Sequence, residues 1–158
     1  MLVISDTSPI ICLALCNKLS ILDELFDKIC IPQSVFNELA VPNKPKTDEI
    51  IELAKSRIVS AKNSAVITAL SQNLDLGESE AMSLYLETNA DFLLIDDKKG
   101  RTIATRNGIR IIGTMGVLLW AKQKGFLIKI KPVLDLIMQT DYRISNNLYL
   151  QILDRAGE

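Results

Sequence analysis

The segment FLLIDD, residues 92–97, is an apolar run that ends in two acids, and it indicates the fold of this chain. A second segment of the same kind, LVISD, occupies residues 2–6. Both runs are short enough for strands and lack the alternation of a half-exposed sheet, which favours a parallel sheet that is covered on both faces. Because the carboxyl ends of parallel strands meet at one edge, we expect Asp6, Asp96 and Asp97 at that edge.

Strand-like and helix-like segments alternate along the rest of the chain. Further apolar runs at residues 28–31, 57–61 and 110–112 predict three more strands. Apolar residues at spacings of three and four predict helices between the strands, with one or two more after Pro132. The alternation predicts an α/β three-layer sandwich, in which a central parallel sheet of about five strands is flanked by helices. The predicted helices are residues 8–15, 33–39, 47–55, 65–72, 78–88 and 114–124.

Length and composition limit the classes of protein to which the chain can belong. With 158 residues, 48% of them hydrophobic, it has the size of one ordinary domain. We expect a single domain over residues 1–158, in which residues 132–158 form a C-terminal helical extension. No apolar run nears the length that spans a bilayer, and the first residues lack the basic leader of a secretory signal. We therefore expect a cytoplasmic protein with no membrane partner, and reduced, buried thiols at its three cysteines.

The sequence contains no histidine, which excludes several kinds of catalytic and metal site. Ser-His-Asp and Cys-His catalytic machinery cannot be built, and no imidazole can bind zinc. General acid–base work must fall to carboxylates, lysine or metal-bound water. A phosphatase with an aspartyl nucleophile is disfavoured as well, because it needs a second acid two residues after Asp6, where Ser8 stands.

Acidic residues on the predicted helices extend the candidate site. Glu38 lies on the helix that follows the second strand, and Glu78 and Glu80 begin the helix that leads into the FLLIDD strand. Carboxylates about 4 Å apart repel by roughly 4 kcal/mol per pair at an effective dielectric near 20, so a cluster of them needs protons or a bound cation. With oxygen ligands alone, the expected ion is Mg²⁺ or Mn²⁺.

Each acid also has an ordinary structural interpretation. Asp6 could cap a helix, and Glu38 alone could be a solvated helix residue. Glu78 and Glu80 are two positions apart on a helix and point in different directions, so we expect at most one of them to bind metal. We rank Glu80 first, because Glu78 follows Gly77 directly and is typical of a first-turn acid that interacts with the helix dipole.

A basic segment follows the acids directly. Residues 98–131 contain nine lysines and arginines and no acid, whereas residues 1–97 contain seven bases and fifteen acids. An acidic cluster beside a basic surface is typical of a site that holds a hard cation and receives a polyanion. The ordinary alternative is a solvated helix face. The candidate phosphate-binding or nucleic-acid-binding residues are Lys98, Lys99, Arg101 and Arg106.

The acidic motifs resemble those of the PIN-domain superfamily. The similar segments are DTS at residues 6–8, VFNEL at 35–39, GESEA at 77–81 and LLIDD at 93–97, and the resemblance spans residues 1–124. It implies an α/β nuclease fold and, as in VapC-like toxins, RNA cleavage with Mg²⁺ or Mn²⁺. By this resemblance, the catalytic and metal-site acids are Asp6, Glu38, Glu80 and Asp97, with Asp96 as a further metal ligand and Ser8 and Glu78 as supporting residues.

The resemblance also sets expectations for activity and partners. It implies an endoribonuclease that acts on RNA as the toxin of a type II toxin–antitoxin pair, with an antitoxin protein as a candidate partner and a homodimeric assembly. The chain carries the Gly-Glu-x-Glu-Ala and Asp-Asp-x-x-Gly-Arg signatures of one branch, and its third acid is Glu where the superfamily usually has Asp. This departure leaves an alternative open: a catalytically weak nucleic-acid-binding or protein-binding module that keeps the fold. We assign Trp120 to the core or to a dimer interface.

Overall fold

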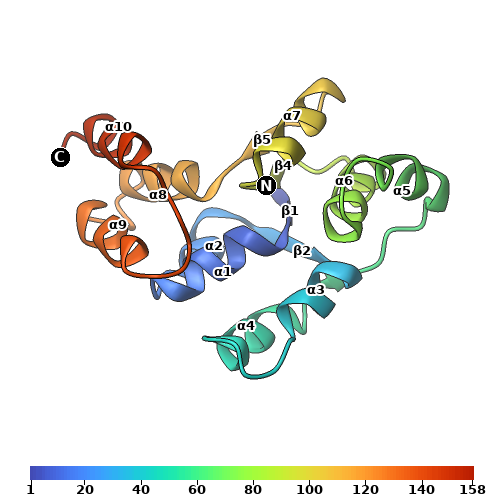
Figure 1. The fold of residues 1–158 in the computed structure, drawn as a ribbon, viewed down its shortest axis with the longest axis horizontal. Coiled ribbons are helices and arrows are strands. Elements are labelled where there is room, and N and C mark those ends of the chain that lie inside the picture. The colour runs from blue at the N-terminus through green and yellow to red at the C-terminus, as the bar shows by residue number, and fades with distance from the viewer.

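The computed structural model describes residues 1–158 and contains a five-stranded sheet and ten helices (Figure 1). The strand order is β3-β2-β1-β4-β5, and every neighbouring pair is parallel. Because helices cover both faces of this sheet, the predicted α/β three-layer architecture is confirmed. The strands are β1 (Leu2–Ser5), β2 (Lys28–Pro32), β3 (Ile58–Val59), β4 (Phe92–Leu94) and β5 (Ile111–Ile112).

Every connection between successive strands contains at least one helix, as parallel pairing requires. Two helices lie in each of the first three connections, one lies between β4 and β5, and three follow β5. In chain order they are α1 (Thr7–Leu15), α2 (Ile21–Leu25), α3 (Gln33–Leu39), α4 (Thr47–Ala54), α5 (Ser64–Leu70), α6 (Leu76–Thr88), α7 (Lys98–Arg106), α8 (Thr114–Gln123), α9 (Lys131–Met138) and α10 (Asn146–Ala156).

The sheet separates two apolar cores, because successive residues of a strand point to opposite faces. In β1, Val3 belongs to a core of 28 buried residues and Ile4 to a core of 12. In β4, Leu94 and Leu93 divide between the two cores in the same way. All four side chains are completely buried. This burial on both faces explains why the strands are continuous apolar runs in the sequence.

Each core is covered by its own helices (Figure 1). The smaller core contains residues of α6 and α7, and the larger one contains residues of α1 to α4 and of α8 to α10. The Trp120 ring packs edge-on against Phe26 and Phe92, with centroids 5.9 and 6.0 Å apart, so it belongs to the larger core. The three cysteines are free and buried, as expected. No helix combines the length and the apolar content that crossing a bilayer requires.

Two helices, α2 and α7, are not predicted by the apolar periodicity. The five residues of α2 are too few to establish a period. In α7 only Gly100 and Ala104 are buried, so the helix offers too few large apolar residues to establish a period. This helix begins instead at a polar cap, where the Gly100 N–H donates to the Asp97 carboxylate at 2.8 Å. The first nine residues of the basic segment therefore form a helix with one mostly exposed face.

The last residue of the chain connects the C-terminal helices to one another. The Glu158 carboxylate accepts hydrogen bonds from the backbone N–H groups of Ile130 and Lys131, at 2.7 and 3.0 Å, and pairs with Lys122 of α8. The hydrogen bond from Lys122 contributes most to lowering the pKa of Glu158 to about 2. These contacts fix the end of α10 against α8 and the start of α9.

Candidate functional site

Asp6 lies where the central strand β1 passes into α1. Its backbone N–H donates to the Leu94 carbonyl at 2.9 Å, so the end of β1 is tied to the end of β4. Asp6 occupies the N-cap position of α1, but its side chain makes no capping hydrogen bond. The residue is only 5% exposed. A helix-capping role therefore does not account for this buried carboxylate.

Three further acids raise the pKa of Asp6 through their charges, and a fourth, Asp97, acts on one of them. Burial raises the pKa of Asp6 to about 7, and the charges of Glu78, Asp75 and Glu38 raise it further. Burial also raises the pKa of Glu78 to about 7, with contributions from Asp75 and Asp97. The parallel pairing of β1 with β4 thus brings together acids from four separate segments of the chain. We call Asp6, Glu38, Asp75, Glu78 and Asp97 the acidic cluster.

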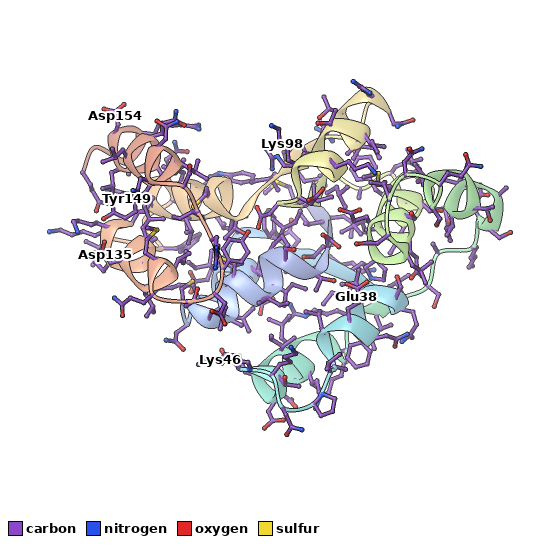
Figure 2. The ribbon with its side chains drawn as sticks, viewed as in Figure 1. Glu38, Lys46, Lys98, Asp135, Tyr149 and Asp154 are labelled. Carbon is purple, nitrogen blue, oxygen red and sulfur yellow. The ribbon has the colours of Figure 1, made fainter.

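Glu38 reaches the acidic cluster from α3 (Figure 2). Its carboxylate accepts a hydrogen bond from the Thr7 hydroxyl and lies directly over Gly77 at the start of α6. A Cβ atom at position 77 would lie 2.6 Å from Glu38 Oε1, so this approach needs a glycine. Thr7, rather than the predicted helper Ser8, makes the hydroxyl contact. Sequence reasoning missed Thr7, although it stands inside the DTS motif.

Glu78 is held by a capping box at the start of α6. Its backbone N–H donates to Asp75 Oδ1 at 2.8 Å, and its carboxylate accepts from the Asp75 N–H at 3.3 Å. A Cβ atom on Gly100 would lie 2.8 Å from Glu78 Oε1, so the carboxylate also contacts the first turn of α7. Asp75 was not predicted as a site residue. The Asp-x-x-Glu spacing of the capping box is the signal that could have found it.

Glu80 lies away from the acidic cluster, although the sequence analysis ranked it above Glu78 as a metal ligand. Its Oε2 atom accepts hydrogen bonds from the backbone N–H of Ser34, at 2.8 Å, and from the Ser34 hydroxyl. Its Oε1 atom accepts from the Ala61 N–H at 3.1 Å. Two helical steps separate Glu78 from Glu80 by about 200° around the axis, so only one of them can face Asp6. Glu78 takes that position, and Glu80 connects α6 to α3 and to the segment after β3.

The neighbouring acids Asp96 and Asp97 also point in different directions. Asp97 caps α7 and contributes to the raised pKa of Glu78. The Asp96 carboxylate instead accepts from the Thr114 N–H at 2.8 Å and from the hydroxyls of Thr114 and Tyr142. The structure therefore places Asp97 in the acidic cluster and directs Asp96 to the beginning of α8.

The acidic cluster has the chemistry of a hard-cation site in an open arrangement. Its oxygen atoms are the ligands that Mg²⁺ and Mn²⁺ prefer. No three of these side chains converge closely enough to form a complete metal site. Protons on Asp6 and Glu78 relieve the repulsion near neutral pH, since both pKa values are about 7. Glu38 and Asp97 are exposed, so they are the ligands that could move toward a bound ion.

A hollow of about 770 Å³ adjoins the acidic cluster along α7. Asp97 lines it together with Lys98, Lys99 and Arg106, and none of these three bases forms an ion pair. Figure 2 labels Lys98 at the beginning of α7. Arg101 faces the β5 side of the helix, where its guanidinium donates to the backbone carbonyl that precedes Asp96 at 2.9 Å. The predicted basic residues therefore lie on two sides of one helix.

A parallel sheet with carboxylates at the ends of its central strands defines an α/β protein with an acidic edge site. A family model described as DUF3368, PIN domain, matches residues 2–158, and the chain belongs to this PIN-domain family. The predicted superfamily is confirmed, and the match extends through α9 and α10. PIN domains are generally nucleases and typically use divalent metal ions. No curated protein matches the chain.

The same substitution at the two glutamates of α6 should change the free energy of unfolding by different amounts. Glu80→Gln places an amide NH₂ against backbone donors and should lower the free energy of unfolding by about 1–3 kcal/mol. Glu78→Gln removes a buried charge among other acids and should change it by less than about 1 kcal/mol. Urea denaturation at pH 7.5 measures both values. A larger loss for Glu78→Gln would contradict the assigned roles.

The raised pKa values predict a pH-dependent stability. The native state binds more protons than the unfolded state between the ordinary pKa of Asp6, 3.8, and its native value of about 7. The free energy of unfolding should therefore fall by about 2–4 kcal/mol as the pH rises from 5 to 8 without divalent cations. Asp6→Asn should flatten this slope, while Asp48→Asn, on the exposed side of α4, should keep it. Urea denaturation in EDTA tests this, and equal slopes in both variants would refute it.

Proposed function

We propose that this PIN domain is an endoribonuclease that depends on Mg²⁺ or Mn²⁺. One observation carries the proposal: the acidic cluster lies beside a hollow lined by bases that have no acidic partner. The cluster offers hard oxygen ligands, and the hollow offers cations for the phosphates of a polyanion. The two halves of the site meet at Asp97, which belongs to both.

The proposed roles of the acids follow from their burial. Asp6 and Glu78 would be the inner ligands, because both are buried and fixed at the ends of β1 and α6. A bound divalent cation would stabilise their charged forms and supply an activated water for attack at phosphorus. With a pKa near 7, either acid could also exchange a proton with that water or with the leaving group.

The basic residues would hold the substrate by its backbone. Lys98, Lys99 and Arg106 project from one helix next to the acids, and phosphate contacts from them would give salt-dependent affinity with little sequence preference. Aromatic residues make up only 5% of the chain, so stacking of many bases on an open platform is not expected. The substrate would be positioned by charge, with the scissile phosphate at Asp97.

Cleavage of RNA by purified protein tests the proposal. The wild-type protein with Mn²⁺ should cleave a labelled single-stranded RNA, and EDTA should abolish the cleavage. Asp6→Asn should reduce the rate by at least about 100-fold, because it removes a charged oxygen ligand from the site. Asp48→Asn is the matched control and should cleave like the wild type. Equal cleavage by all three proteins would refute the proposed site.

A second candidate function is a catalytically weak module that binds nucleic acid or protein and keeps the fold. The open arrangement of the acids favours this alternative, since no three of them are in position for a metal ion. Calorimetric titration with Mn²⁺ distinguishes the two functions. Binding at millimolar Mn²⁺ or below supports the nuclease, and absence of binding together with retained RNA affinity supports the module.

A finer proposal is that the nuclease is the cytoplasmic toxin of a type II toxin–antitoxin pair, with an antitoxin protein as its partner. It is supported by the resemblance of the acidic motifs to those of VapC-like toxins, and a homodimer stays a prediction of the same resemblance. Induced expression in a bacterial host should arrest growth, and Asp6→Asn should restore it at equal protein level. Growth curves and immunoblots measure both. Arrest by both proteins would show that toxicity does not come from the acidic site.

A further inference from the structure

Three hollows lie next to one another across α7, and we call them together the track. The hollow that contains Asp97 shares Thr102 and Arg106 with a second hollow of about 420 Å³. The second shares Arg101 and Ile111 with a third, of about 400 Å³. Residues of α7, α8 and α10 line this third hollow. The track therefore runs from the acidic cluster, over α7, to α10, and Figure 1 shows α7 between the α5–α6 pair and the α8–α10 group.

The track carries an uncompensated positive charge. Five bases line it, and none of them takes part in an ion pair. The only acids that line it are Asp96 and Asp97, and the Asp96 oxygens are already engaged by Thr114 and Tyr142. Such a surface attracts a polyanion. The five bases are Lys98, Lys99, Arg101, Arg106 and Arg155.

The third hollow adds an apolar wall to this charge. Its lining includes two basic residues, Arg101 and Arg155, and four apolar residues: Ile112 of β5, Met115 of α8, and Leu148 and Ile152 of α10. Unpaired bases of single-stranded RNA are bound by apolar contact and by stacking on guanidinium planes, while their phosphates take ionic contacts. Arg155 lies in the last turn of α10, which Glu158 fixes against α8 and α9.

We propose that a single-stranded RNA crosses α7 along this track, with one phosphate at Asp97 and a flanking nucleotide in the third hollow, held by Arg101 and Arg155. This inference rests on the proposed nuclease function and extends it to the substrate path. A helix with its side chains is about 10–12 Å wide, so a ligand that reaches both ends must contain several nucleotides. RNA is favoured over an acidic peptide because the track begins at the acidic cluster and ends at an apolar hollow.

Binding measurements with two RNA lengths test the path. Fluorescence anisotropy in EDTA compares a labelled 12-nucleotide single strand with a trinucleotide across a range of salt concentrations. Arg155→Ala should weaken binding of the longer RNA about fivefold to tenfold and reduce the salt slope by about 0.7, the value for one phosphate contact on a single strand. Trinucleotide binding should not change, because a short ligand can stay at the Asp97 end.

Two further variants serve as controls. Lys124→Ala removes an exposed base from the far end of α8, about 15 Å from its beginning, and should bind both RNAs like the wild type. Arg155→Lys keeps the charge and should restore the wild-type salt slope. It should recover only part of the affinity, because an ammonium group cannot stack on a base. Recovery of the salt slope would show that the effect of Arg155→Ala is a lost contact and does not come from disturbance of α10. Binding is measured without metal, so it is independent of the cleavage assay. RNA that binds through Arg155 but is not cleaved with Mn²⁺ would refute the proposed nuclease activity and would still support the proposed binding path.

Two results would overturn the inference. The first is unchanged affinity and salt slope for the longer RNA in Arg155→Ala. The second is competition by polyglutamate as effective as competition by unlabelled RNA of equal charge, since that outcome would assign the track to an acidic peptide.

Discussion

The pairing of β1 with β4 is the constraint on which the site depends. Asp6 and Asp97 lie far apart in the sequence, and the parallel register sets Ser5 opposite Leu94 so that both strands end at the same edge. The hydrogen bond from the Asp6 N–H to the Leu94 carbonyl continues the ladder to the acid itself. Two apolar cores, one on each face, hold these strands in place, so the burial that stabilises the sheet also fixes the positions of the carboxylates.

Two glycines allow the helices to bring the remaining acids to this edge. Gly77 leaves space for the Glu38 carboxylate over the start of α6, and Gly100 leaves space for Glu78 at the start of α7. A Cβ atom would lie 2.6 Å from Glu38 Oε1 at position 77 and 2.8 Å from Glu78 Oε1 at position 100, so a side chain at either position would press on an acid. At position 100 it would also lie 2.6 Å from Cδ1 of the buried Ile95. The geometry of the acidic cluster therefore depends on the absence of a side chain at Gly77 and Gly100.

Much of the fold could be predicted from the sequence, because strands that are buried on both faces give continuous apolar runs. The edge of the sheet at which Asp6 and Asp97 lie could also be predicted, because the carboxyl ends of parallel strands meet at one edge. The position of Glu80 could not be predicted, because its partner Ser34 lies 46 residues away in the sequence and is brought close only by the tertiary fold. The capping box of Asp75 and Glu78 is local, so its Asp-x-x-Glu spacing was available in the sequence. The α7 helix was missed because it begins at a polar cap and buries almost no apolar surface.

The number of hydrogen-bond donors distinguishes Glu80 and Asp96 from Asp6. Glu80 and Asp96 each accept several hydrogen bonds, which satisfy their charges and fasten one element to another. Asp6 is as buried as Glu80, yet no side chain donates to its carboxylate. Burial raises its pKa to about 7, a backbone hydrogen bond from Thr7 opposes this rise, and the charges of neighbouring acids add to it. A buried charge that is left without donors destabilises a protein unless something else supplies the compensation. Protons can supply it in the free protein, because the pKa values of Asp6 and Glu78 are both about 7. Under the proposed function, a divalent cation would supply it instead.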